Sequence, residues 1–444
     1  MIHFNISILK TYNTLLDYAR GEKNMITILC SGSRGDFQPY IALALELKKL
    51  GKDVRITGMR NFESFIRGYG IDFYPIEADF ESLGVDKNMI KDAQKADNPL
   101  KMLLAFNKMK KYGILVAHEF YAACEGSELI VYHPGMTLGY FAAEKLGIPS
   151  VLASPFPLHK TKEQLSVIIY GRNYSKLIPA RLSFSILQGM LWLASKDSVK
   201  GFWKTQFGSA PKNFGCPFER HTDKQHPAIV SCSNFVFDRP SDWNENIHQS
   251  GYWFVEEQTD YIPSEELSNF LSAGEKPVYL GFGSVFDMDE RDTILKLVTE
   301  ALAKSGRRGM LGGMGKIDNL PNNIFAIDSI PHSWLFDRVS AVCHHGGAGT
   351  TAAGFKAGVP SIIIPFSNDQ FAWAQRAYDL GVGSKPIPRK TLTSDNLAEA
   401  INYALQDKIV VNSKVLAKNI VTENGAGDCA KVILTTNASI NTSH

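Results

Sequence analysis

The sequence has few cysteines, and none of them forms a closely spaced pair. Its 444 residues include six, each standing alone: Cys30, Cys124, Cys216, Cys232, Cys343 and Cys429. Zinc sites and small disulfide scaffolds both need closely spaced cysteines, so the sequence favours neither. Isolated cysteines are typical of a reducing compartment, and we therefore expect a cytoplasmic protein.

Long hydrophobic runs and an excess of one charge are also lacking. The most apolar stretch, Leu182 to Ala194, is shorter than the roughly 20 residues that a membrane-spanning helix needs. The amino terminus lacks the pattern of a secretory signal. Lysine plus arginine (47) nearly balance aspartate plus glutamate (45), for a net charge of +2. We expect no nucleic-acid partner and at most peripheral contact with a membrane.

What the sequence does contain is an alternation of short apolar strands and helical segments, which occurs twice. The first series begins at Met25 with MITILC, a glycine-bearing turn and a helical pattern from Pro39 to Leu50. The second series begins with PVYLGFGS and ends with VPSIIIPF. Strands that alternate with helices predict parallel sheets with right-handed crossovers.

The length is sufficient for two domains of ordinary size. We predict an α/β fold of two Rossmann-like, doubly wound domains that face each other across a cleft, with ligands at the carboxyl ends of the strands. We assign residues 1–24 to an amino-terminal extension, 25–240 to the first domain, 241–260 to a linker, 261–436 to the second domain and 437–444 to a polar tail. The last helix is a candidate to pack back on the first domain.

A glycine-rich turn in the second half carries the strongest chemical signal. In VCHHGGAGTT, an apolar strand leads into His345, the small residues Gly347, Ala348 and Gly349, and then Thr350. Small residues let backbone N–H groups and a helix N-terminus approach an anion closely. The turn therefore predicts a phosphate site with hydrogen bonds from the histidine and the threonine. The alternative is a tight strand-to-helix turn around a hydrogen-bonded histidine.

The next strand, VPSIIIPF, ends in Ser367-Asn368-Asp369-Gln370. A carboxylate beside an amide at the end of a parallel strand supplies acceptors and donors that suit the adjacent hydroxyls of a sugar. We predict that Asp369 and Gln370 bind such a sugar. The alternative is that Asn368 or Asp369 caps the following helix.

At this point a family resemblance becomes specific. The segment HHGGAGTTAAGFKAGVPSIIIPFSNDQFAWAQR resembles the nucleotide-sugar signature of the UDP-glycosyltransferase superfamily, and CSGSRGDFQPYIALALELKKLG, RPSDWNENIHQSGYWF and SIPHSWLFDR agree with it. The nearest branch holds sterol glucosyltransferases and bacterial glycosyltransferases of glycopeptide and macrolide antibiotics. The resemblance covers about residues 25–435. It implies the GT-B fold and an inverting transfer from a UDP-sugar co-substrate, with neither a metal ion nor a cofactor.

The resemblance also implies roles for individual residues of the donor site. Matching positions hold the diphosphate (His345, Ala348, Gly349, Thr350 and Ser284), the sugar hydroxyls (Asp369 and Gln370) and the uracil (Ile330 and His332). This chain departs from plant members, which have Trp-Ala-Pro-Gln in place of Ser329 to His332, and a ribose-binding glutamate in place of Ala353. The base and the ribose contacts are therefore the least specified part of the donor site.

The first glycine-bearing turn, Gly32-Ser33-Arg34-Gly35-Asp36, carries the candidate for proton transfer. An acceptor hydroxyl must lose its proton as it attacks the anomeric carbon, so a general base is needed in the cleft. We predict that Asp36 is this base, because the sterol and antibiotic branch carries aspartate in G-S-R-G-D. Ser33 and Arg34 resemble positions that reach the donor. The alternative is that Asp36 caps the helix that follows.

His133, in VYHPG at the end of another first-domain strand, is a second candidate for proton transfer. We expect it to lie near Asp36 and to share the proton; a histidine of the core or of the acceptor site is the alternative.

The sequence thus predicts a metal-independent glycosyltransferase. The expected donor is UDP-glucose, and the expected acceptor is a hydrophobic molecule with a hydroxyl group, such as a sterol, a polyketide, a flavonoid or a lipid. Two other functions remain open: a UDP-sugar hydrolase or epimerase of the same fold, and a non-catalytic helper that binds a nucleotide sugar.

Overall fold

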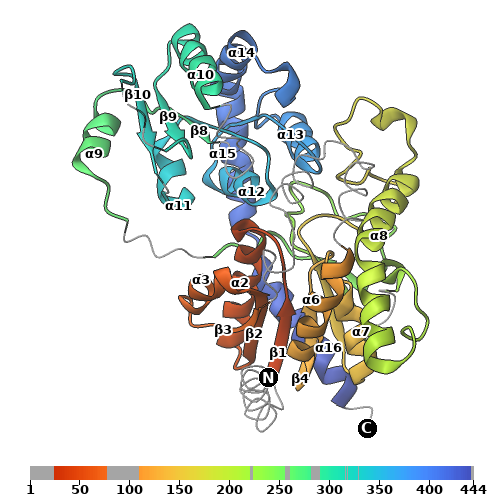
Figure 1. Cartoon of the computed structure of the whole chain (residues 1–444). Helices are drawn as coiled ribbons and strands as arrows, with labels where there is room; N and C mark the ends of the chain where they lie inside the picture. Colours follow the sequence, from red (N-terminus) through yellow and green to blue (C-terminus); the bar gives the residue numbers. More distant parts are fainter. Residues whose placement is uncertain are drawn as a thin grey trace.

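Two parallel β-sheets, one above the other in Figure 1, form the centres of two domains. The computed structural model describes residues 25–77, 110–220, 224–255, 261–281, 291–315, 317, 319–328 and 330–441. The extension assigned to 1–24 lies outside the described residues. Within the described ranges, no helix is both long and apolar enough to span a membrane.

The first sheet has seven strands in the order β3-β2-β1-β4-β5-β6-β7. The strands are β1 (Met25–Leu29), β2 (Asp53–Met59), β3 (Asp72–Ile76), β4 (Ser127–Tyr132), β5 (Ser150–Ser154), β6 (Ala228–Val230) and β7 (Ile247–Gln249). All neighbouring strands pair in parallel. The predicted strand at MITILC is confirmed as β1, and the apolar segments SELIVYHP and IPSVLAS form β4 and β5.

The second sheet has five strands in the order β10-β9-β8-β11-β12, again all parallel. They are β8 (Val278–Gly281), β9 (Gly309–Gly312), β10 (Ile324–Ile327), β11 (Ala341–His344) and β12 (Ser361–Ile363). The two sheets share the arrangement in which the chain starts at the centre, winds outward to one edge and then crosses to the other. The predicted fold class, two doubly wound α/β domains, is confirmed.

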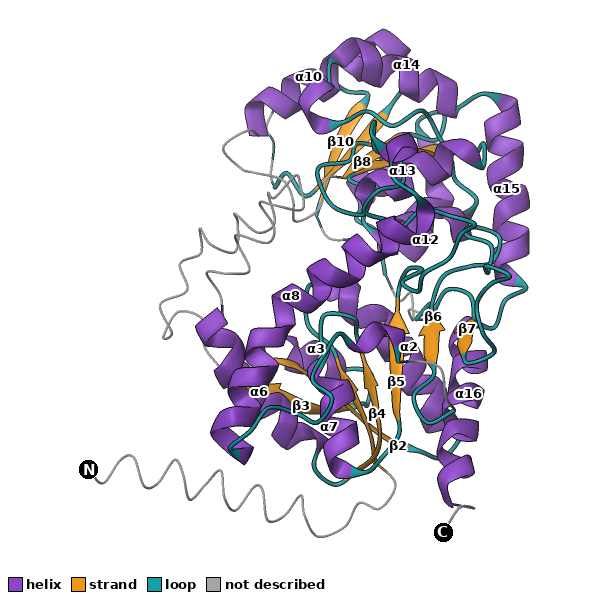
Figure 2. Cartoon of the chain, turned by 90° about the vertical axis from the view of Figure 1, so that its right-hand side faces the viewer, coloured by secondary structure: helices purple, strands orange, loops and turns teal. Residues whose placement is uncertain are grey.

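Helices cover both faces of each sheet (Figure 2). Those of the first half are α2 (Arg34–Lys49), α3 (Glu63–Arg67), α6 (Lys110–Cys124), α7 (Leu138–Leu146) and α8 (Ala180–Phe207). Those of the second half are α9 (Glu265–Ser272), α10 (Arg291–Ser305), α11 (His332–Leu335), α12 (Ala348–Ala357), α13 (Gln370–Asp379), α14 (Ser394–Ala404), α15 (Asp407–Val421) and α16 (Gly425–Asn441).

Alternate residues of the first sheet enter different cores. One face, with Ile26, Ile28 and Val131, packs against α2, α3 and α16. The other face, with Ile130 and Tyr132, packs against α6 and α7, and α8 adds a further layer. This alternation follows from the two-residue repeat of a strand. Because both faces are buried, the strands are almost continuously apolar.

The last helix, α16, leaves the second domain and packs on the first. Its residues Ala426, Cys429, Ala430 and Ile433 belong to the same core as α2 and the first sheet. Figure 1 shows α16 beside the first sheet, at the end of the molecule opposite α14. The chain therefore crosses between the domains twice, once after β7 and once between α15 and α16.

Three segment boundaries differ from those expected from the sequence. β7 lies within the segment 241–260 that was assigned to the linker, because it pairs in register with β6. α16 continues to Asn441, into the expected polar tail 437–444, since neither glycine nor proline interrupts the helix there. α2 begins at Arg34, five residues before Pro39, because Ser33 and Asp36 organise its first turn.

The docking of α16 can be tested by removing buried volume. Ile433 is fully buried, whereas Val421, at the end of α15, is 66% exposed. Ile433→Ala should lower the free energy of unfolding by about 2–4 kcal/mol, because it leaves a cavity between α16 and the first sheet. Val421→Ala should change it by less than about 0.5 kcal/mol. Denaturant unfolding of both variants measures this, and equal effects would contradict the packing.

Candidate functional site

The predicted motifs lie where each sheet changes its winding direction. In the first sheet this point is between β1 and β4, and in the second it is between β8 and β11. Ligands of doubly wound sheets bind at these points, outside the carboxyl ends of the strands. β1 leads into the Gly32 turn, β4 into His133 and β11 into the His345 turn. The turn after β8 contains Ser284, which lies outside the described residues.

The Asp36 side chain folds back over the turn that precedes α2. Its Oδ2 accepts hydrogen bonds from the Ser33 backbone N–H (2.6 Å) and the Ser33 hydroxyl (2.9 Å). Gly32 has a φ of 130°, and a β-carbon there would overlap Asp36 Oδ2. Asp36 therefore caps α2, as the alternative interpretation expected. Both of these hydrogen bonds go to Oδ2, and none that the structure assigns within the described ranges goes to Oδ1.

His133 follows β4 and lies next to the end of β1, because its backbone N–H donates to the Leu29 carbonyl (3.0 Å). Its ring Nδ1 accepts a hydrogen bond from the Gly135 N–H (3.0 Å). The proton of the neutral ring is therefore on Nε2. Burial lowers the pKa of His133 below 6.5, while the nearby negative charge of Asp36 acts to raise it.

The turn after β11 forms an uncapped helix N-terminus. Gly347 is the N-cap of α12, and in the described part of the chain no cap side chain accepts hydrogen bonds from the first backbone N–H groups. The His345 ring lies against this residue, since a β-carbon at Gly347 would be 2.6 Å from its Nε2. A β-carbon at Gly346 would meet Ile363 and the backbone of Gln370. The turn is thus packed closely and keeps its N–H groups available for an anion.

Asp369 and Gln370 are fixed by contacts within their own turn. Asp369 Oδ2 accepts a hydrogen bond from the Trp373 indole N–H (2.8 Å). Gln370 Oε1 accepts from the backbone N–H groups of Phe366 (2.8 Å) and Ser367 (3.1 Å). The amide oxygen of Gln370 is thus used by backbone N–H groups. Its Nε2 is a hydrogen-bond donor that can serve a ligand.

The Asp36 turn and the Asp369 turn face each other across the two domains. α12 packs against α2, and Figures 1 and 2 both show α12 directly above α2. Burial raises the pKa of Asp369, and the negative charge of Asp36 raises it further. The two carboxylates are therefore close enough to interact, although 333 residues separate them in the sequence. A ligand bound at α12 is within reach of groups from both domains.

Comparison with known proteins agrees with this geometry. The model of the glycosyltransferase family 28 N-terminal domain matches residues 26–164. The model of the erythromycin biosynthesis protein CIII-like C-terminal domain matches residues 312–435. The kitacinnamycin glycosyltransferase superposes with a TM-score of 0.67 at 18% identity, covering 93% of this chain and 99% of that one. The chain has the GT-B fold.

Curated relatives of this GT-B chain include sterol glucosyltransferases. Sterol 3-beta-glucosyltransferase UGT80A2 of Arabidopsis thaliana is 32% identical over 420 residues, which are 91% of this chain and 64% of the relative. The sterol 3-beta-glucosyltransferase of Glomerella lagenarium is 31% identical over 439 residues, which are 95% of this chain and 29% of the relative. The chain thus spans less than two thirds of the length of either. SsfS6 of Streptomyces sp. SF2575, complexed with thymidine diphosphate, superposes with a TM-score of 0.60 at 17% identity, covering 93% of this chain and 99% of that one.

Three residues predicted to contact the donor have side chains held by other contacts. The Arg34 guanidinium lies over the Phe65 ring (4.4 Å to the centroid), so in this conformation it is held against α3. Ile330 precedes α11, and His332 opens that helix with its ring stacked on Phe336 (4.6 Å between centroids). Since α11 packs against α12, Ile330 and His332 border the turn that is predicted to bind phosphate.

Sequence reasoning missed two residues that shape the GT-B site. Trp373, which holds Asp369, lies four residues after it, on the same face of α13. That spacing is readable in the sequence. Arg172, which contacts the Asn368 carbonyl (3.1 Å), lies 196 residues away and has no sequence signal of its own.

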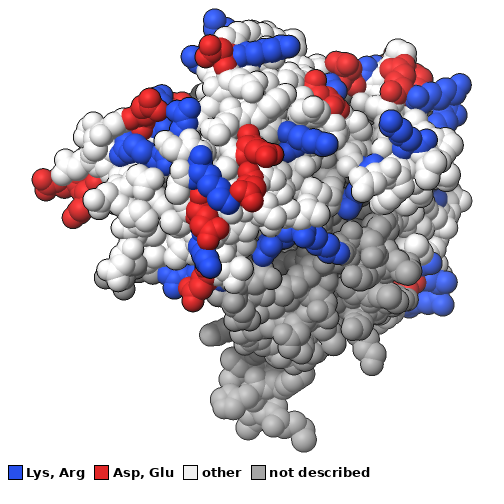
Figure 3. Space-filling view, turned by 90° about the horizontal axis from the view of Figure 1, so that it is seen from above, with Lys and Arg blue, Asp and Glu red and all other residues white. Residues whose placement is uncertain are grey.

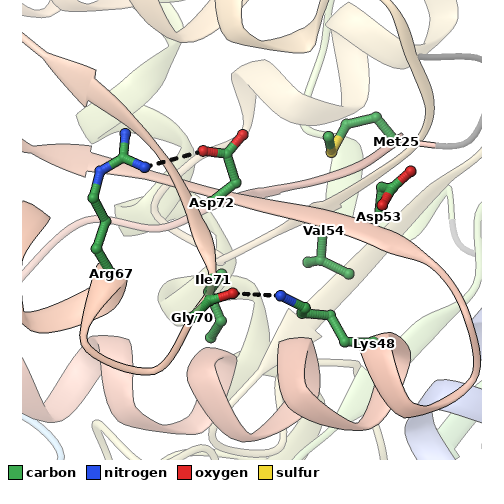
Figure 4. A pocket seen from close by; sticks show the side chains of 8 residues that line it. All are labelled: Met25, Lys48, Asp53, Val54, Arg67, Gly70, Ile71 and Asp72. Atoms are coloured by element: carbon green, nitrogen blue, oxygen red, sulfur yellow. Dashed lines mark hydrogen bonds and ion pairs between the residues drawn. The ribbon is translucent and has the colours of Figure 1, made fainter. Parts of the chain in front are cut away.

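A cavity of about 430 Å³ lies in the first domain, at the end of the sheet away from the Asp36 turn (Figure 4). It is at the amino ends of the strands, and its lining consists of Met25, Lys48, Asp53, Val54, Arg67, Gly70, Ile71 and Asp72. Arg67 pairs there with Asp72 (3.3 Å), and Lys48 donates to the Gly70 carbonyl. The cavity is therefore separate from the GT-B site.

The surface charge of the second domain is mixed. Figure 3, a view from above, shows acidic and basic side chains interspersed over the described part of this face. The second domain also contains ion pairs between opposite charges, such as Lys304–Asp395 (2.6 Å) and Arg307–Glu275 (3.0 Å). No single-sign patch of the kind that binds nucleic acid is visible on this described face.

The negative charge of Asp36 is predicted to influence the pKa of His133. Asp36→Asn removes a negative charge that raises the pKa of His133, so this pKa should fall further below 6.5. NMR titration with labelled histidine measures it, with His133→Gln for assignment. Asp53→Asn, an exposed change at the start of β2, should leave the pKa unchanged. An unaltered His133 pKa in Asp36→Asn would mean that the two groups do not interact.

Proposed function

We propose that the chain transfers glucose from UDP-glucose to the hydroxyl of a hydrophobic acceptor, with inversion at the anomeric carbon and without a metal ion or a cofactor. The observation that carries this proposal is the meeting of three helix N-termini from two domains. α2 brings Asp36, α12 brings uncapped N–H groups, and α13 brings Asp369 and Gln370. A base, an anion site and a polyol site are then adjacent.

The donor diphosphate is assigned to α12 rather than to α2. Asp36 already occupies the first turn of α2, whereas the N-cap of α12 is Gly347 and has no side chain. The N–H groups of Ala348, Gly349 and Thr350, with the His345 ring, stabilise the negative charge that grows on the leaving UDP. Ile330 and His332 border the uracil of the donor nucleotide. The chain's family resemblance favours UDP, and a neighbouring structure holds thymidine diphosphate.

Asp369 and Gln370 orient the hexose. Gln370 Nε2 donates to one hydroxyl oxygen, and the Asp369 carboxylate accepts from an adjacent hydroxyl. Trp373 fixes the carboxylate from the opposite side. This orientation presents the anomeric carbon toward the first domain, where Asp36 lies.

Asp36 accepts the proton of the acceptor hydroxyl. As that oxygen attacks, a bond forms between it and the anomeric carbon, and the bond from this carbon to the UDP oxygen breaks on the opposite face. The proton ends on Asp36 and the electron pair on UDP. His133 carries its proton on Nε2, so it serves as a hydrogen-bond donor beside the base and not as the base.

The acceptor is expected to be a sterol or a molecule of similar shape and polarity. Sterol 3-beta-glucosyltransferases are relatives of this chain. Half-buried apolar side chains follow the next two strands of the sheet beside β1: Met136, after β4, accepts a hydrogen bond from Ser31 Oγ (3.3 Å), and Phe156 follows β5. The site of action that we propose is the cytoplasm, in keeping with the six unpaired cysteines.

The base assignment predicts a large loss of turnover in Asp36→Asn. The amide cannot take the acceptor proton, so the rate of transfer should fall by roughly 10²–10⁴-fold. The assay uses UDP-glucose, EDTA and a pooled panel of sterols, phenols and lipid alcohols, with products detected by mass spectrometry. Turnover close to that of the wild type would remove Asp36 from the mechanism.

The same assay separates the competing functions. Acceptor mass gain of one hexose supports the transferase. Free glucose or an isomer without such a gain indicates a hydrolase or an epimerase, and binding without any turnover indicates a helper protein. Loss of activity in EDTA would contradict metal independence. TDP-glucose in place of UDP-glucose tests whether the donor nucleotide carries uracil or thymine.

The close contact between Gly32 and Asp36 can be tested with two glycine variants in this turn. A β-carbon at Gly32 overlaps the Asp36 carboxylate, whereas the nearest atom to one at Gly35 is Ser33 Oγ at 3.7 Å. Gly32→Ala should displace Asp36 and reduce turnover by at least about tenfold. Gly35→Ala lies within α2 and should retain activity with equal or higher stability. Equal activities of the two variants would show that the position of Asp36 is not critical.

A further inference from the structure

Three consecutive first-domain residues, Tyr170, Gly171 and Arg172, contact α13 of the second domain. They belong to the long connection between β5 and α8, which lies next to α13 in Figure 1. The Tyr170 hydroxyl donates a hydrogen bond to Asp379 Oδ2, at the carboxyl end of α13. Arg172 reaches the opposite end of the same helix.

Arg172 makes two contacts at the start of α13. Its Nη2 donates a hydrogen bond to the Asn368 carbonyl oxygen (3.1 Å), and its guanidinium lies over the Phe371 ring, 3.8 Å from the centroid. A planar guanidinium combines stacking with directed N–H donors, which a lysine does not. The contacts flank Asp369 and Gln370 on both sides in the sequence.

The backbone at these contacts is specialised. Gly171 has a φ of 76°, and a β-carbon there would overlap the Phe371 carbonyl oxygen. Asn368 also has a positive φ, 49°, which asparagine tolerates better than most residues. The peptide group that Arg172 holds is the one that joins Asn368 to Asp369. Its orientation therefore sets the direction in which the Asp369 turn begins.

We propose that Arg172 is a positioning residue for the donor sugar: a first-domain side chain that holds the Asn368–Asp369 peptide so that Asp369 and Gln370 face the hexose. The proposal rests on the proposed function and adds to it that recognition of the sugar requires the two domains to be in contact. The nucleotide contacts at α11 and α12 do not involve Arg172. In support, Arg172 is near enough to Asp369 to act against the rise in its pKa.

A second set of first-domain contacts also holds α13. These contacts make it possible to distinguish a positioning role of Arg172 from a role in docking the domains. Arg376 donates to the Val236 carbonyl and lies over the Phe237 ring (5.4 Å), and Phe237 packs against Trp373 (5.5 Å between centroids). These first-domain contacts remain when Arg172 is changed. Arg172→Ala should therefore release the start of α13 and leave the domains together.

The experiment compares the affinities of UDP and UDP-glucose for the full chain by isothermal titration calorimetry. In Arg172→Ala, the affinity for UDP-glucose should fall by about tenfold or more, because a charge-assisted hydrogen bond is lost, and the affinity for UDP should stay within about twofold. Arg308→Ala is the matched control: Arg308 also stacks on a phenylalanine, Phe270 (4.2 Å), and donates to a carbonyl, that of Glu275 (2.9 Å), but lies away from the site.

A double-mutant cycle with Asp369→Asn gives a readout that a purely structural role would not move. If Arg172 acts through the turn that carries Asp369, the loss of UDP-glucose affinity in the double variant should be smaller than the product of the two single losses. Thermal unfolding checks that each variant is folded. Phe371→Leu, which removes the stack and keeps Arg172, is the second test and should lower UDP-glucose affinity in the same direction.

Several results would overturn the inference. Equal losses of UDP and UDP-glucose affinity would make Arg172 a general domain contact. No loss of UDP-glucose affinity, or losses that multiply in the double variant, would show that it does not act through Asp369. A wild-type chain that does not bind UDP-glucose, or an Asp369→Asn variant that binds it normally, would instead overturn the proposed sugar site, and the inference with it.

Discussion

The packing of α13 against the first domain is the contact on which the rest of the site depends. Trp373, Ala374 and Ala377 share one apolar core with Val230, Val236 and Phe237 of the first domain. This core continues into α12 through Ala352 and Phe355. Because the two helices that carry the donor-site turns rest on the first domain, the position of Asp36 relative to Asp369 is fixed by apolar packing and not by the carboxylates, which repel each other.

The helices α2, α12 and α13 begin with different caps. At α2, the Asp36 side chain takes up the Ser33 N–H, so this end is locally satisfied and holds a carboxylate. At α12, Gly347 provides no side chain, so the positive end of the helix is left for an anion. At α13, Asp369 turns to Trp373. In the function that we propose, one structural motif thus supplies a base, an anion site and a polyol site.

Much of this could be predicted from local patterns. The strand-turn-helix units around Gly32 and His345 are encoded by apolar runs that end in glycine, and each predicted strand occurs at its predicted place. The Asp36 cap was open as an alternative, because an acidic residue in the first turn of a helix suits both roles. The elements β7 and α16 extend beyond the expected segment boundaries where the pattern is weak: β7 is only three residues long, and the end of α16 has a mixed composition.

The sequence by itself determined the two doubly wound domains, the glycine turns and the polar residues that follow the strands, because these depend on periodicity and on steric demands within a few residues. Only the tertiary structure decided which of these residues meet. Arg172 reaches the Asn368 carbonyl across 196 residues, and α16 returns to the first sheet. The His133 tautomer was also decided there, because it depends on a backbone N–H in a turn. Such contacts follow from packing and orientation, which no local pattern records.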